Sequence, residues 1–271
     1  MAEEESEFWS PTVPSDDTPI WRYRDLSQFL SILEKQSLWF NRADLFSDPF
    51  EGSFAKANVE TRQFRYAQTE IPNDVLETMS VMAKKFRKTT YLNCWHINTH
   101  ESAAMWDLYL PADKGIAIRS TVGRFREAIN ESDNDAKIEI DTDDDEVEEL
   151  DAIMKIGKVN YIDYSSKLIP ESNSFAPLYH KRKSYEHENE FRASFSKFGD
   201  MLELQGGLRP DADFATAPGH NVEVDLSKLI ESVYVAPSAP NWFFEVLESV
   251  TDRYDIDIQI QQSDLDDDPV F

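Results

Sequence analysis

The chain has 271 residues, of which 41% are hydrophobic and 12% aromatic, as is typical of a globular protein with one large domain or two small ones. A single cysteine excludes an internal disulfide framework. The formal net charge of −25 argues against general binding to nucleic acid or to anionic membranes, because phosphate contacts need lysine and arginine. The same charge is consistent with a solubilising shell or with a docking surface for a basic protein partner.

Two features of the sequence predict where the protein is located in the cell. No apolar run approaches the roughly 20 residues that a membrane-spanning helix needs. The first residues are acidic, where a secretory signal would be basic. The sequence therefore predicts a cytoplasmic protein with no membrane partner.

The first elements in chain order follow a proline-containing segment. Residues 1–19 carry three prolines among acidic side chains and are predicted to form a flexible leader. Asp25 is then predicted to cap a helix over 26–33, where apolar residues recur at helical spacing. A short strand is expected at 37–40, and Asp48 before a proline predicts a turn.

The remaining elements alternate irregularly between helix and strand. The capping-box spacing of Asn98 and Glu101 predicts the start of a helix that contains Met105. The other expected elements are a helix from 74, strands at 91–95, 116–118, 158–161, 190–195 and 233–235, a helix from 241 and an edge strand at 256–260. This order predicts an α+β fold over 20–271, a single compact domain with a mixed, mostly antiparallel sheet and packed helices.

An acidic block interrupts this domain at about 131–151. Twelve of its positions are acidic and only Lys137 is basic. Such a block repels itself and has little to bury, so we expect a mobile surface insertion.

The stretch from Tyr185 to Arg192 carries the strongest chemical signal. In an extended conformation, Glu188, Glu190 and Arg192 would lie on one polar face, with the two carboxylates about 6.6 Å apart. Two close carboxylates shift each other's pKa, and a neighbouring arginine can hold one of them ionised. An ordinary exposed face with a glutamate–arginine pair fits the same pattern.

Two further segments are candidates for binding. Arg22 and Arg24 alternate with aromatic residues and suit an anion or a planar ring, although a strand with solvated arginines fits equally. Cys94, His96 and His100 resemble metal ligands, but no second Cys/His pair completes a zinc site, so no metal is predicted.

Taken in order, several short motifs resemble the prokaryotic family called domain of unknown function 2971. They are Trp-Arg-Tyr-Arg at 21–24, Ser-Leu-Trp-Phe at 37–40, Asp-Pro-Phe-Glu at 48–51, Met-Trp with Tyr109 at 105–109, Lys-Gly at 114–115, Val-Asn-Tyr at 159–161, and His-Lys-Arg at 180–182 leading to Glu-x-Glu-Phe-Arg at 188–192. The match spans about 20 to 263, nearly the whole chain. Ser47 departs from the family's usual asparagine.

A second resemblance, at the level of the fold, is to ADP-ribosyltransferases, which use NAD as substrate. It implies Arg24 or Arg22 as phosphate anchor and Trp39 or Tyr109 as stacking ring. It also implies that Glu188 activates the nucleophile and that Glu190 stabilises the transition state. The remaining motif residues that we expect in the same substrate site are Glu51, Trp106 and Arg192.

Three functions remain open at this point. The resemblance implies an NAD-using transferase of a prokaryotic phage-defence or toxin system. The acidic surface also suits a binding module without chemistry. Paired carboxylates at roughly 5 to 9.5 Å suit a hydrolase of glycosidic bonds.

Overall fold

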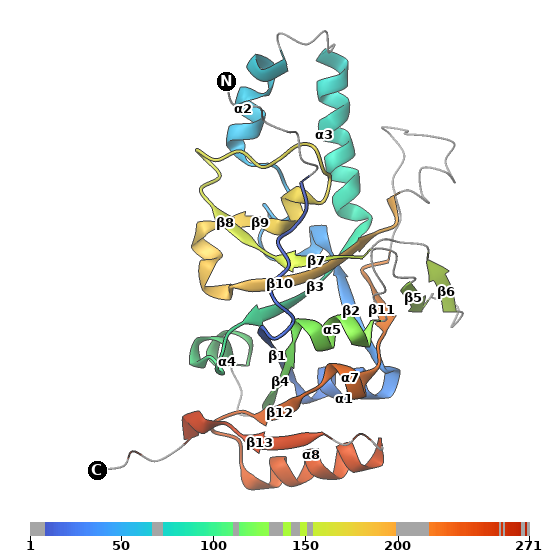
Figure 1. Cartoon of the computed structure of the whole chain (residues 1–271), viewed down its shortest axis with the longest axis vertical. Helices are drawn as coiled ribbons and strands as arrows, with labels where there is room; N and C mark the ends of the chain where they lie inside the picture. Colours follow the sequence, from blue (N-terminus) through green and yellow to red (C-terminus); the bar gives the residue numbers. More distant parts are fainter. Residues whose placement is uncertain are drawn as a thin grey trace.

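The computed structural model describes residues 9–66, 73–110, 114–129, 138–141, 147–150, 154–198, 217–254, 256, 258–266 and 269 (Figure 1). Its helices are α1 (Leu26–Lys35), α2 (Lys56–Tyr66), α3 (Asn73–Lys88), α4 (Ala103–Tyr109), α5 (Val122–Ala128), α7 (Leu226–Leu229) and α8 (Asn241–Arg253). Short 3-10 helices include η1 (Ala43–Leu45), η2 (Ala176–Tyr179), η3 (Lys183–Glu188) and η4 (Asp264–Asp266). Among these residues, no helix has both the length and the apolar composition needed to cross a membrane.

The strands form one large sheet and one small one. They are β1 (Pro19–Asp25), β2 (Ser37–Arg42), β3 (Thr90–Ile97), β4 (Gly115–Thr121), β5 (Ile138–Asp141), β6 (Val147–Leu150), β7 (Lys155–Lys158), β8 (Asn160–Ile162), β9 (His180–Arg182), β10 (Glu190–Ser196), β11 (Gly219–Glu223), β12 (Ser232–Val235) and β13 (Gln259–Gln262). The large sheet runs β13-β12-β4-β1-β3-β2-β11-β5-β6, and β10 pairs with β3 and β7. Its pairs are antiparallel except β12 with β13, so the predicted α+β class is confirmed.

The core lies on both faces of the sheet. On one face Phe29 of α1 and Phe125 of α5 pack with Trp95 of β3 in the largest apolar cluster. On the other face Trp21 and Tyr23 of β1 pack with Met105 and Trp106 of α4. Because alternate residues of a strand point to opposite faces, β1 contributes to both layers.

Local signals explain some element boundaries and fail at others. Asp25 caps α1 as predicted, because its side chain accepts from the Gln28 amide at 2.8 Å. The predicted capping box at Asn98 and Glu101 is wrong, since Ser102 caps α4. Glu101 instead accepts from the Trp106 indole at 2.7 Å, which is a tertiary contact.

The acidic block contains strands that we did not expect. Within it β5 and β6 pair with each other, and β5 pairs with β11 at Ile140 and Val222. The rest of the block lies outside the described residues, so its mobility stays a prediction.

The described part of the predicted leader contacts the domain. The Trp9 ring lies 6.1 Å from the Tyr179 ring, between centroids. The Lys158 amide donates to the Thr12 carbonyl at 2.8 Å. Residues 9–18 thus lie against the fold, whereas residues 1–8 are outside the described part.

Candidate functional site

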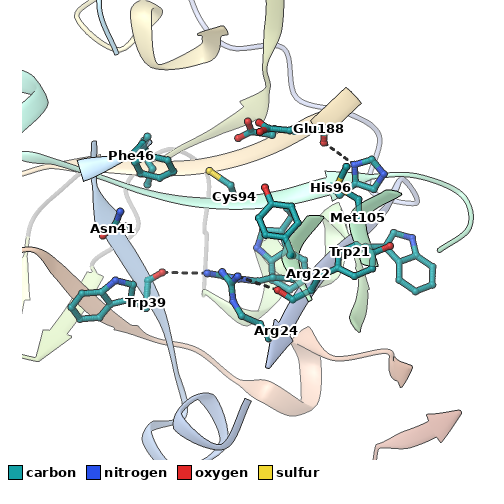
Figure 2. Close-up of a pocket in the computed structure, with 15 residues that line it drawn as sticks. Trp21, Arg22, Arg24, Trp39, Asn41, Phe46, Cys94, His96, Met105 and Glu188 are labelled. Atoms are coloured by element: carbon teal, nitrogen blue, oxygen red, sulfur yellow. Dashed lines mark hydrogen bonds between the residues drawn. The ribbon is translucent and has the colours of Figure 1, made fainter. Parts of the chain in front are cut away.

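A cavity of about 240 Å³ opens where three strands of the sheet diverge. The C-terminal end of β3, at His96 and Ile97, pairs with β1. The N-terminal part of β3, at Tyr91 and Leu92, pairs with β2. Between these two contacts β1 and β2 separate, and the cavity lies in this fork (Figure 2). It is lined by Trp21, Arg22, Tyr23, Arg24, Trp39, Asn41, Phe46, Leu92, Cys94, Trp95, His96, Met105, Tyr109, Glu188 and Glu190.

Most of the site residues predicted from the sequence line this one cavity, and three do not. Those that line it are Arg22, Arg24, Trp39, Tyr109, Glu188 and Glu190. Glu51 and Arg192 are buried next to Glu190, where they form ion pairs. Trp106 packs edge-on against Tyr23 at 5.0 Å and belongs to the core.

The arginine end of the cavity carries buried positive charge without a carboxylate partner. Arg22 is only 5% exposed, and its sole hydrogen bond among the described residues is from Nη2 to the Trp39 carbonyl at 3.4 Å. Arg24 Nη1 donates to the Tyr23 carbonyl at 3.1 Å. Within the described part of the chain neither guanidinium has a carboxylate at ion-pair distance.

The surroundings of these two arginines lower the pKa values of both side chains. Burial, and then the charge of Arg24, hold the pKa of Arg22 well below its usual range. Burial also lowers the pKa of Arg24. Both shifts mean that the surroundings disfavour the charged forms, and a bound anion would relieve this cost.

The opposite end of the cavity holds a carboxylate in a fixed position. Glu190 accepts from Lys181 Nζ at 2.7 Å and from Arg192 Nε at 2.7 Å. Arg192 is fully buried and also binds Glu51 with both terminal nitrogens. Burial alone would raise the pKa of Glu190, but the charges of Arg192 and Lys181 outweigh it and hold that pKa well below its usual range.

Glu188 differs from Glu190 in conformation and in protonation. It ends the 3-10 helix η3, and Asn189 then turns in the left-handed region with a φ of 36°. The expectation of one extended, exposed face through 188, 190 and 192 is therefore wrong. Burial, and then the neighbouring Glu190, raise the pKa of Glu188 to about 8, although Lys181 Nζ contacts its carboxyl group. Near neutral pH the pair is a carboxylic acid beside a carboxylate.

His96 lines the cavity but was considered from the sequence only as a metal ligand. Its Nδ1 lies 2.7 Å from the Glu188 carbonyl oxygen, which can only accept, so Nδ1 carries the proton. Burial lowers the pKa of His96 and keeps the ring neutral. Nε2, a hydrogen-bond acceptor in this tautomer, is buried without a partner among the described residues.

Two aromatic rings stand at the rim between the two ends. Trp39 is 43% exposed and Tyr109 is 49% exposed, values that are high for such large side chains. The Trp39 ring lies against Gly219, where a Cβ atom would come within 2.3 Å of it. A glycine is thus needed to hold this ring at the rim, where it can stack on a planar group.

Comparison with known proteins adds little to this picture. No family model matches the chain, and no curated protein matches it, so the resemblance to domain of unknown function 2971 is not confirmed. A solved structure titled "Thermus sp. 2.9 DarT in complex with carba-NAD+" is similar over 93% of this chain and 98% of that chain, at 8% identity and a TM-score of 0.34. A likeness this weak assigns neither fold nor function.

Proposed function

We propose that the cavity binds NAD⁺ and that the protein transfers the ADP-ribose part to an acceptor. One observation carries the proposal: two arginines, the buried Arg22 and the half-buried Arg24, lie without a carboxylate partner among the described residues at one end of a cavity whose other end holds an ionised carboxylate. NAD⁺ has the matching pattern, with an anionic pyrophosphate joined through a ribose to a cationic nicotinamide ring. Figure 2 shows Arg24 and Glu188 on opposite sides of the cavity.

In this proposal Glu190 acts on the ribose of the nicotinamide end. The bond between ribose C1′ and the nicotinamide nitrogen breaks, its electron pair leaves with the neutral nicotinamide, and positive charge develops on the sugar. Glu190, held at 2.7 Å by both Lys181 and Arg192, would stabilise that charge without reorganising. The acceptor then bonds to C1′ and releases its proton.

The acid form of Glu188 limits its role in accepting that proton. With a pKa of about 8, Glu188 is mostly protonated at pH 7 and cannot then act as a base. If Glu188 takes the proton from the acceptor, turnover should increase as the pH rises from 6 towards about 8. Glu188→Gln should abolish this rise, and initial rates of nicotinamide release across that pH range measure it.

The hydrolase alternative fits the geometry less well. Lys181 Nζ contacts the carboxyl groups of Glu188 and Glu190 at the same time. A glycosidase needs its two carboxyl groups on either side of the bond to be cleaved. Because one ammonium group contacts both carboxyl groups, the carboxyl groups of Glu188 and Glu190 lie together and not on either side of a substrate bond.

The test of the proposal is NAD⁺ consumption by the wild type and by Glu190→Gln, with a cell lysate as the source of acceptor. A charged stabiliser in such a site is worth several kcal/mol, so turnover should fall roughly a hundredfold or more. Binding of the unreactive product ADP-ribose, measured by calorimetry, should change little, because Glu190 acts mainly in the transition state.

Glu60→Gln is the matched control, since Glu60 pairs with Lys56 on an exposed helix face. It should leave turnover unchanged. A wild type that binds no ADP-ribose, or equal NAD⁺ consumption by wild type and Glu190→Gln, would refute the transferase and favour the binding module.

A further inference from the structure

A second cavity, of about 450 Å³, adjoins the first. The two share three lining residues, Arg22, Arg24 and Trp39. The second cavity is further lined by Gln28, Ser31, Ile32, Lys35, Ser37 and Asn221. The two arginines therefore stand between the first cavity, which contains Glu190, and a second one bounded by α1 and β2.

The lining of the second cavity is cationic, which is unusual in a chain with a net charge of −25. Arg22, Arg24 and Lys35 contribute to it, and none of its lining residues in the described part of the chain is a carboxylate. Lys35 lies in the last turn of α1, and no ion pair of its side chain occurs among the described residues. The electrostatics favour an anionic group here.

The cavity also offers unused hydrogen-bonding groups. Ser37 is 4% exposed, and its Oγ is buried without a partner in the described part of the chain. Nε and Nη1 of Arg22 are also buried without a hydrogen-bond partner among the described residues. Buried polar groups are normally hydrogen-bonded, so these orphaned atoms point to a missing ligand.

We propose that the second cavity binds a phosphate group on the adenosine ribose, so that the dinucleotide is NADP⁺ in preference to NAD⁺. The inference rests on the proposed function. With the pyrophosphate at the two arginines and the nicotinamide towards Glu190, the adenosine half extends into the second cavity. In dinucleotide-binding Rossmann folds a carboxylate on the ribose 2′-hydroxyl selects NAD⁺, whereas a cation accommodates a 2′-phosphate, and the same charge argument applies to this cavity. Among the described residues of this lining Lys35 is present and no carboxylate is.

The test compares two unreactive ligands, ADP-ribose and its 2′-phosphorylated form, titrated into the full chain by calorimetry. The wild type should bind the phosphorylated ligand about tenfold more tightly, the effect of one charge-assisted contact. Lys35→Gln should reduce this preference to about twofold or less, with unchanged affinity for ADP-ribose. Because Lys35 is exposed, the variant should fold normally.

Lys158→Gln is the matched control, since Lys158 is an exposed lysine of β7 outside both cavities, and it should keep the preference. Equal affinity of the wild type for both ligands, or a preference that survives Lys35→Gln, would overturn this inference and leave the transferase proposal standing. Binding of neither ligand would overturn both.

Discussion

The two ends of the cavity differ in whether their buried charged side chains have ion-pair partners. At one end Glu51, Lys181, Glu190 and Arg192 form a connected network in which every charge has a partner within the protein. At the other end Arg22 is equally buried, and among the described residues it has one long hydrogen bond to a backbone carbonyl and a contact with the Trp95 ring at 5.5 Å, but no carboxylate partner.

Because of this difference, we expect one end of the site to contribute to stability and the other end to ligand binding. A buried charge with good partners is costly to disturb, whereas a buried charge without partners costs stability until something binds to it. The carboxylate network thus fixes Glu190 in place, and the arginine end remains available for an anion. Changes at the two ends should therefore have opposite effects on folding.

The largest effect is expected at Arg192. Replacing it with leucine leaves Glu51 buried without its bidentate partner and Glu190 with Lys181 alone. Removing one member of a buried pair costs about 3–5 kcal/mol, and urea unfolding measures it. The control, Lys56→Ala, removes an exposed pair within α2 and should cost about 0.3–0.5 kcal/mol. Similar losses for the two variants would contradict the comparison.

A second effect, which depends on pH, is expected at Glu188. Its pKa is raised on folding, to about 8, so the folded state holds the proton more tightly than the unfolded chain. The stability from this group is fully present below the unfolded pKa and is lost as the pH rises through about 8. Glu188→Gln should remove this loss, which amounts to at most about 1.4 kcal/mol per pH unit.

Unfolding of wild type and Glu188→Gln at pH 5 and pH 8.5 tests this. The stability of the wild type relative to the variant should fall between the two values. A difference that stays constant would show that Glu188 has an ordinary pKa in the folded protein.

The smallest change in stability, and of the opposite sign, is expected at Arg22. Arg22→Met removes a buried charge that has no carboxylate partner among the described residues, and it keeps most of the side-chain volume. The free energy of unfolding should therefore stay the same or increase by about 1 kcal/mol, which thermal unfolding measures. A loss of 3 kcal/mol or more would show that Arg22 is structural, like Arg192.

Much of the fold could be predicted from local patterns. Asp25 and the apolar residues that follow it predict α1, and the strands predicted at 37–40 and 190–195 correspond to β2 and β10. Tertiary contacts decided the rest. Glu101 resembles a capping residue but accepts from Trp106 and Ser263, and the strand β11 has too few apolar residues to be recognised without its partner β2.

The candidate site could be predicted only as a list of residues. Their order in the chain indicated six of the cavity's lining side chains, but not that Arg192 is fully buried in ion pairs while Arg22 has no carboxylate partner among the described residues. Lys181, which contacts both glutamates, lies in the His-Lys-Arg motif at 180–182, to which the sequence assigned no role. Pairing depends on which strands lie side by side, and one sequence does not carry that information.

The central claim, that the unpaired arginine end is an anion site, is tested most directly by titrating ADP-ribose into the wild type and Arg22→Met by calorimetry. Arg126→Met is the control, because Arg126 pairs with Asp16 on the surface. We predict binding to the wild type and to the control, and at least about tenfold weaker binding to Arg22→Met, since charged hydrogen bonds to a phosphate are lost. Equal binding by all three proteins would contradict the claim.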